Sequence, residues 1–208
     1  MKKRLLSLCL VGVLCFTLTG CGSTDFRTAE FNGETISLGE DESSVDEKYG
    51  AFVTGSYIED DEDHQLKIEW SDDDTISVIG ADNYNGEVGK IGNLSPNASI
   101  DEVSDALGLD KNDIGNNVEY VYFFNEDNEM ILYLPTAIPE DYVRNDHDLR
   151  EKFSGLDDIL KFYAPQYQNE FDNSKYALEI EITDGKLSSI FAVDVQMVAK
   201  GKANGWMF

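Results

Sequence analysis

The sequence has no cysteine after residue 21, since its cysteines are Cys9, Cys15 and Cys21. Residues 22–208 therefore offer no thiol for a disulfide, for a thiolate zinc site or for a cysteine nucleophile. Burial and hydrogen bonding alone must stabilise whatever fold these residues adopt.

Histidine and catalytic motifs are also scarce. Neither His64 nor His147 has a sequence neighbour that suggests a catalytic triad or a metal pair. The patterns G-x-S-x-G, H-E-x-x-H and Walker A are absent. We therefore predict a protein that is not an enzyme and has no cofactor and no metal site.

Basic residues are few, with 16 Lys and Arg against 41 Asp and Glu. Three of the basic residues and none of the acidic ones lie in residues 1–20, so residues 21–208 carry a formal charge of −28. Such a surface repels nucleic acid and anionic lipid headgroups, and we expect no nucleic-acid partner. An aromatic content of 11% nevertheless favours a folded core over disorder.

The only long apolar run, residues 5–16, is too short to span a bilayer, which takes about 20 residues. It follows three basic residues and precedes Leu18, Thr19, Gly20 and Cys21, the order of a secretory signal. These four residues resemble a bacterial lipobox, in which Leu18, Thr19 and Gly20 are recognised by the signal peptidase and the thiol of Cys21 receives the lipid. The resemblance predicts a protein anchored to the outer, extracytoplasmic face of the cell membrane. The alternative is an ordinary secretory leader in which Cys21 is incidental.

Composition and periodicity predict an α+β fold with two tandem units of short helix plus antiparallel β-sheet. The predicted segments are a signal peptide (1–20), a lipidated polar tether (21–34), a first helix-plus-sheet unit (35–90), a second unit (91–198) with a helical insertion at about 147–170, and a C-terminal tail (199–208).

A weak internal repeat supports the two units. Each copy contains a short helix that ends at a glycine, Gly50 in the first and Gly108 in the second. Ser99 is the expected N-cap of the second helix, and Glu102 completes a capping box.

Hairpin patterns follow these helices, over residues 66–79, 119–134 and 176–195. In the last one, Asp184-Gly185 predicts a tight turn and strict alternation places Glu179 and Glu181 on one side of the sheet. We expect that side to face water.

An apolar stripe at helical spacing marks the insertion, and it consists of Leu149, Phe153, Leu156, Ile159, Leu160 and Tyr163. Pro165 is expected to end this pattern. The stripe either packs on the sheet or docks a partner. For Trp206 and Phe208 in the tail, the sequence leaves three alternatives open: they fold back onto the domain, they fray, or they anchor an interface.

Several motifs carry a resemblance to a known family, namely Ile91-Gly92-Asn93-Leu94, Ser99-Ile100-Asp101-Glu102-Val103, Leu107-Gly108, residues 178–182, Asp184-Gly185-Lys186 and Ile190. Together with the lipobox, they resemble uncharacterised lipoproteins common in Firmicutes. More distantly, they resemble the tandem units of the beta-lactamase inhibitory protein and the related small outer-membrane lipoprotein domain. The resemblance implies the fold, the membrane anchor and, by analogy, a binding role. Nothing in the chain corresponds to an inhibitory loop.

The sequence thus predicts a cell-envelope lipoprotein that acts as a binding or interaction module. Its partners are the membrane, through the lipid on Cys21, and an envelope protein or wall polymer. Three alternatives remain: an enzyme that uses clustered carboxylates, a calcium-binding protein or a solute receptor. Residues 110–115 begin like an EF-hand loop, but Ile114 and Val121 occupy positions where calcium ligands are expected. The oligomeric state is left open.

Overall fold

The computed structural model has an α+β fold, which confirms the predicted fold class. It describes residues 24–50, 53–54, 56–59, 65–83, 89–136 and 156–203. The elements in chain order are β1 (Thr28–Phe31), β2 (Glu34–Ser37), α1 (Glu42–Tyr49), β3 (Val53–Thr54), β4 (Tyr57–Glu59), β5 (Gln65–Trp70), β6 (Ile76–Asp82), β7 (Lys90–Ile91), α2 (Ile100–Leu107), η3 (Lys111–Asp113), β8 (Val118–Phe124), β9 (Met130–Pro135), α4 (Leu156–Asn173), β10 (Tyr176–Thr183), β11 (Lys186–Asp194) and α5 (Val195–Ala199).

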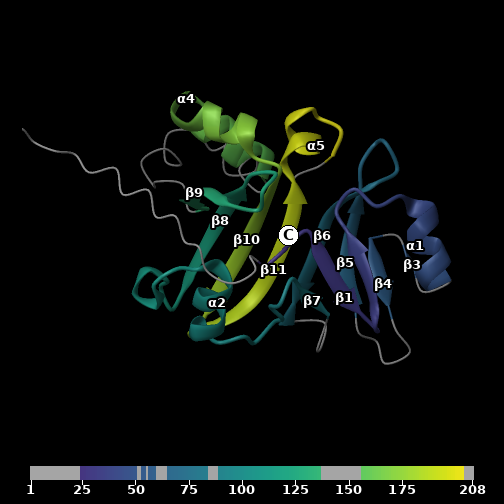
Figure 1. Cartoon of the computed structure of the whole chain (residues 1–208), viewed down its shortest axis with the longest axis horizontal. Coiled ribbons are helices and arrows are strands. Elements are labelled where there is room, and N and C mark those ends of the chain that lie inside the picture. The colour runs from purple at the N-terminus through teal and green to yellow at the C-terminus, as the bar shows by residue number, and fades with distance from the viewer. Residues whose placement is uncertain are drawn as a thin grey trace, which may run out of the picture.

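An antiparallel sheet of eight strands dominates the described part of the chain, in the order β3-β4-β5-β6-β11-β10-β8-β9. A smaller sheet, β2-β1-β7, is the other one formed by the described residues. In Figure 1, α4 and α5 lie at the upper end of the large sheet, α1 lies to the right of its strands, and α2 lies near the lower end of β8, β10 and β11.

The two units share the large sheet, because β6 from the first pairs with β11 from the second, with Val78 opposite Val193. Counting outward from this junction, the hairpin β10–β11 occupies the position equivalent to β5–β6, and β8–β9 lies farther out. The hairpins 66–79 and 119–134, which follow the helices of the two copies, therefore do not occupy equivalent positions in the sheet. A strand order of this kind depends on pairing between distant segments, which local alternation does not determine.

The helix ends follow the sequence closely. Ser99 accepts a hydrogen bond from the backbone N–H of Glu102, and the Glu102 carboxylate accepts one from the backbone N–H of Ser99, which confirms the capping box. Gly108 ends α2 in the left-handed conformation, with φ 67°. Asp184 and Gly185 also have positive φ, as a tight two-residue turn between twisted strands requires.

The larger hydrophobic core lies on the face of the sheet that packs with α1, α2 and the small sheet. It includes Phe26, which is 1% exposed and whose ring centroid lies 5.8 Å from that of Phe124. The prediction that residues 21–34 form a tether is therefore wrong from Phe26 onward. The short polar stretch contains two large apolar residues, Phe26 and Phe31, and their burial outweighs the surrounding composition.

The second core lies on the opposite face, beneath α4 and α5. The helical pattern breaks at Tyr167, two residues after Pro165, as the expected end near this proline implies, but a second helical segment then continues α4 to Asn173. Proline removes one backbone donor, but the segment beyond the kink buries Phe171, whose ring lies 5.1 Å from that of Phe123. The described residues of the apolar stripe pack on the sheet, which is the first of the two alternatives for the insertion. Leu149 and Phe153 lie outside the described residues.

Glu179 contradicts the expectation that its side of β10 faces water, since the residue is only 1% exposed. The apolar partner face of β10, with Leu178 and Ile180, packs in the larger core as expected. The structural reason is that the described sheet is covered on both faces, so alternation does not distinguish a core side from a solvent side.

The C-terminal segment returns to the domain at least as far as Ala203, which packs against the second core, beneath α4 and α5. The Lys202 ammonium pairs with the Asp73 carboxylate, and the Lys202 carbonyl accepts a hydrogen bond of 2.7 Å from the backbone N–H of Asp72. Trp206 and Phe208 lie outside the described residues.

Candidate functional site

The residues predicted for lipid attachment and peptidase recognition, which are Leu18, Thr19, Gly20 and Cys21, lie outside the described residues. The first described residue, Thr24, follows Cys21 by three positions. The structure therefore bears on the anchor only through the residues that follow it, beginning with Thr24. No helix in the described part of the chain is both long and apolar enough to cross a membrane.

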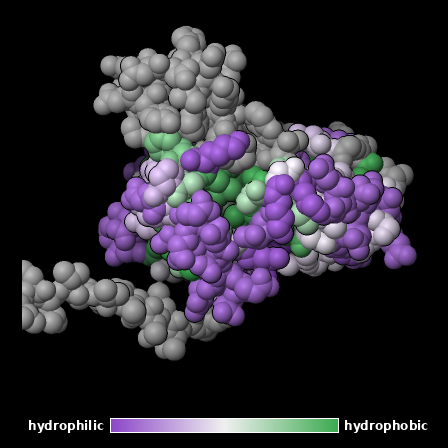
Figure 2. Space-filling model, turned by 90° about the horizontal axis from the view of Figure 1, so that it is seen from above, coloured by the Kyte–Doolittle hydropathy of each residue, from purple (hydrophilic) through white to green (hydrophobic). Residues whose placement is uncertain are grey.

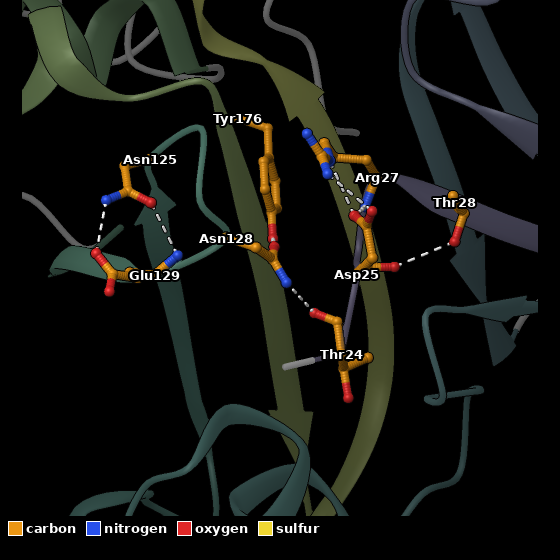
Figure 3. A network of polar contacts seen from close by, with 8 residues as sticks. All are labelled: Thr24, Asp25, Arg27, Thr28, Asn125, Asn128, Glu129 and Tyr176. Carbon is orange, nitrogen blue, oxygen red and sulfur yellow. Dashed lines mark hydrogen bonds and ion pairs between the residues drawn. The ribbon is translucent and has the colours of Figure 1, made fainter. Parts of the chain in front are cut away.

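A polar network fastens the chain as soon as it enters the fold (Figure 3). The Asn128 side chain donates a hydrogen bond of 2.7 Å to the Thr24 carbonyl and accepts one from the Tyr176 hydroxyl. Asp25 accepts two side-chain hydrogen bonds of 2.9 Å from Arg27. Thr24 is thus tied to the β8–β9 turn and, through Asn128, to β10.

Two ionisable groups of this network have shifted pKa values. The hydrogen bonds from Arg27 lower the pKa of the Asp25 carboxyl, although partial burial opposes the shift. Burial raises the pKa of the Tyr176 hydroxyl, which therefore remains a hydrogen-bond donor at neutral pH. The network holds Asp25 ionised and Tyr176 neutral, the states that its hydrogen bonds need.

A second feature is the acidic row, which we define as Glu119, Glu179 and Glu181. Glu119 on β8 lies directly opposite Glu181 on β10, and Glu179 precedes Glu181 by two positions on the same face of β10. Glu119 and Glu181 are half-buried, whereas Glu179 is buried. The row therefore leads from partly solvated carboxyls to an enclosed one.

Glu179 is the unusual member, because neither of its carboxyl oxygens has a hydrogen-bond partner. In the described part of the chain, these are the only buried side-chain oxygen or nitrogen atoms in this condition. The Glu181 carboxylate, in contrast, accepts hydrogen bonds from the hydroxyls of Thr183 at 3.3 Å and Ser189 at 3.4 Å. Most buried polar side-chain atoms in proteins have a partner, so Glu179 needs a specific explanation.

The charges around Glu179 are mostly negative. Burial raises the pKa of its carboxyl well above the usual range, a hydrogen-bonding interaction between the Glu179 and Glu119 side chains raises it further, and the negative charges of Glu119 and Glu181 add to the shift. Lys67 opposes this shift more weakly. Its ammonium forms an ion pair of 3.2 Å with Glu69 and lies 5.5 Å from the centre of the Phe191 ring. These surroundings favour the protonated form of the Glu179 carboxyl and raise its pKa well above the ordinary value.

The strand β6 leaves room beside this row at Gly80, which pairs with Lys67 on one side and Phe191 on the other. A Cβ atom at Gly80 would lie 2.1 Å from the Phe191 ring, so no larger residue fits without moving that ring. Glycine here lets the Phe191 ring lie close to the backbone of β6.

Two open hollows are lined by described residues elsewhere. One, of about 430 Å³, lies between the β8–β9 turn and α4, and its lining is largely acidic and amide side chains, including Glu126, Asp127 and Glu170. The other, of about 460 Å³, lies beside the start of α2. Figure 2 shows a mainly hydrophilic surface on the side seen from above, with a narrower hydrophobic band among the polar side chains. Neither hollow is lined by a member of the acidic row.

Calcium ligation gains no support from the described residues. They contain no group of three or more His, Cys, Asp or Glu side chains placed to hold a metal ion. The Asp110 carboxylate of the EF-hand-like stretch accepts hydrogen bonds from the backbone and side chain of Asn112, at 2.9 and 2.6 Å. It caps the short helix η3.

No protein-family model, curated protein or solved structure matches this chain. The resemblance to envelope lipoproteins therefore stays a prediction.

Sequence reasoning expected the Glu179 side of β10 to face water, which is wrong for Glu179, and it missed the acidic row. The signals were present in two separate patterns. Alternation put Glu179 and Glu181 on one face of β10, and the apolar stripe of α4 required a sheet face to pack against. Only the assembled sheet shows that these are the same face.

Proposed function

We propose that this protein is a cell-envelope lipoprotein, attached to the membrane through Cys21, whose folded domain binds a partner outside the cytoplasm. The lipobox and the absence of later cysteines support the anchor. The early start of the fold adds to it. Three residues beyond Cys21 reach at most about 10–11 Å, so the Thr24 end of the domain is held close to the bilayer.

The acidic row supports the binding role. A buried carboxyl without a partner costs stability, and groups of this kind cluster where a protein binds or reacts with something. With a charge of −28 on residues 21–208, the domain attracts cationic and not anionic molecules. Its partner is a positively charged envelope protein or wall polymer.

Replacing Cys21 by alanine is expected to move the protein from the membrane fraction to the soluble fraction, or to block its processing. The reason is that a two-chain lipid holds a protein stably at a bilayer, and this variant has no thiol to receive it. Membrane fractionation with labelled palmitate measures the effect. Cys15→Ala is the matched control, because it changes a leader cysteine that receives no lipid in this scheme. Unchanged membrane retention of Cys21→Ala would contradict the anchor.

Substituting glutamine for all three glutamates of the acidic row is expected to abolish capture of the partner from an envelope extract. The wild-type protein should capture less as salt rises, because the contact is between opposite charges. The control carries Glu42→Gln, Glu47→Gln and Glu126→Gln, which replace the same number of glutamates at exposed positions. Equal capture by the two triple variants would show that general acidity, and not the acidic row, binds the partner.

One observation favours a second candidate, an envelope enzyme that uses clustered carboxylates. Glu179, with its raised pKa, lies near Glu119, and acid–base enzymes use pairs of carboxyls whose pKa values differ. Such an enzyme must expose the pair to substrate, whereas Glu179 is 1% exposed. The binding role needs no turnover and is the better supported.

A further inference from the structure

We propose that the outer edge of β9 binds an extended, basic segment of a partner protein as an additional antiparallel strand. This inference rests on the proposed binding function and names the chemistry of the partner and its mode of binding. β9 lies at one end of the eight-stranded sheet, where β8 is the strand that pairs with it in the described part of the chain (Figure 1). The described strand pairs of this sheet are antiparallel. An edge strand of this kind can pair with a strand from another chain.

A backbone hydrogen bond shows which groups of β9 point away from β8. The Thr136 N–H donates to the Glu119 carbonyl at 3.2 Å. Because such bonds recur at alternate residues of an antiparallel pair, the backbone groups of Tyr133 and Pro135 point outward. Proline has no N–H, and an outward position at a sheet edge is where it is tolerated. The edge therefore offers an N–H and a C=O from Tyr133 and a C=O from Pro135.

The middle of this edge is accessible. Tyr133 is 53% exposed and is the one large hydrophobic side chain that is exposed among the described residues. β9 contains no charged residue, although charges on edge strands commonly prevent unwanted pairing. The strand at the opposite end of the sheet, β3, has only two residues. β9 is therefore the better of the two ends for an added strand.

The face of β9 that carries Tyr133 favours an apolar side chain in the added strand. The Tyr133 ring stacks on that of Tyr122, with ring centroids 5.9 Å apart, and meets the Tyr120 ring edge-on at 6.1 Å. These contacts hold the partly exposed Tyr133 ring in place. Pairs of an aromatic and a β-branched residue directly opposite each other stabilise antiparallel sheets. A valine or isoleucine opposite Tyr133 fits this position.

The other face, beside α4, favours positive charge. The hollow of about 430 Å³ is lined there by Ile131 and by carboxylates that include Glu126 and Glu170, with no Lys or Arg in its lining. It gives space to a long basic side chain, and the acidic row ends at Glu119, one strand inward from β9. A second copy of this chain is repelled, because residues 21–208 carry a charge of −28. Since side chains alternate between faces, the partner segment should alternate apolar and basic residues.

Binding of a synthetic peptide to the full-length protein in nonionic detergent tests the inference. The probe alternates lysine and valine, has blocked ends and carries a fluorescent label, so that anisotropy reports its binding. Hydrogen exchange, read by mass spectrometry with fragmentation to single residues, follows the backbone amides. At saturating peptide the Tyr133 amide should exchange at least about tenfold more slowly, because it gains a hydrogen bond. The Leu134 amide faces β8 and should be unchanged.

Replacing Tyr133 by proline removes the outward N–H and should weaken peptide binding by at least about tenfold. Tyr133→Val is the matched control, because it loses the same ring but keeps the N–H. The difference between the two variants therefore measures the backbone hydrogen bond, and circular dichroism checks that both are folded. A peptide with glutamate in place of lysine should not bind the wild type, since like charges repel.

Two N-methylated peptides of equal charge make the test independent of any variant. Valine lies opposite Tyr133 in this arrangement, so the valine amides face β9 and the lysine amides face away. Methylating the valine amides should weaken binding by at least about tenfold, whereas methylating the lysine amides should leave it unchanged. Equal binding by the two peptides, the reverse order, or no slowing of exchange at Tyr133 would each overturn the inference. So would protection of Tyr133 without peptide in a dimer, which would make a second copy the occupant. Partner capture that still depends on the acidic row would leave the proposed function standing in each case.

Discussion

Replacing Phe26 by alanine is expected to lower the free energy of unfolding by about 3–5 kcal/mol. Phe26 is 1% exposed and contacts the core that also holds Phe124, so truncation removes buried apolar surface and leaves a cavity. Urea denaturation followed by circular dichroism measures the change. A residue only five positions after Cys21 would then contribute as much stability as a central core residue.

Phe26→Leu is the matched control, because it keeps most of the apolar volume and should cost roughly 1–1.5 kcal/mol. The alternative, that residues 21–34 are a tether outside the fold, makes the opposite prediction. In a tether neither substitution would change the urea midpoint. A stability loss in both variants that is clearly larger for alanine than for leucine supports the buried position of Phe26.

Local features of the fold could be predicted from the sequence because they depend on neighbouring residues. The Ser99–Glu102 capping box, the Gly108 helix end and the Asp184-Gly185 turn each require only a few consecutive side chains of the right kind. The alternation in β10 likewise identified a strand with two different faces. Each of these expectations is confirmed.

The misplaced features depend on contacts between distant segments. Alternation along β10 cannot show that α4 covers the Glu179 side, nor that β6 joins β11. Phe26 was hidden for a related reason, because its burial depends on Phe124, almost a hundred positions later. The acidic row could not be predicted, since Glu119 and Glu181 become neighbours only through the pairing of β8 with β10.

Replacing Glu179 by leucine is expected to raise the free energy of unfolding at neutral pH by about 1–3 kcal/mol, the cost of a buried polar group without a partner. Leucine has a similar volume to glutamate and matches the apolar side chains of the second core, beneath α4 and α5. Urea midpoints at pH 7 measure the gain. The same substitution should weaken capture of the partner from an envelope extract, so the variant would gain stability and lose binding, the usual relation at a binding site kept at the expense of stability.

The pH dependence of stability isolates the same carboxyl. Glu179 has a raised pKa in the folded protein, so above its usual value of 4.5 the unfolded chain loses this proton while the folded protein keeps it. Stability should therefore fall as pH rises from about 5, by up to about 1.4 kcal/mol per pH unit, until the folded carboxyl ionises. Asp25 and Glu40 have lowered pKa values, and their stabilisation is lost only as pH falls below about 4.5, outside this window. The slope should disappear in Glu179→Leu and persist in Glu181→Gln, which retains the buried carboxyl. An identical slope in wild type and Glu179→Leu between pH 5 and 8 would mean that Glu179 is ionised in the folded protein, and that its charge is already neutralised by a group of this chain.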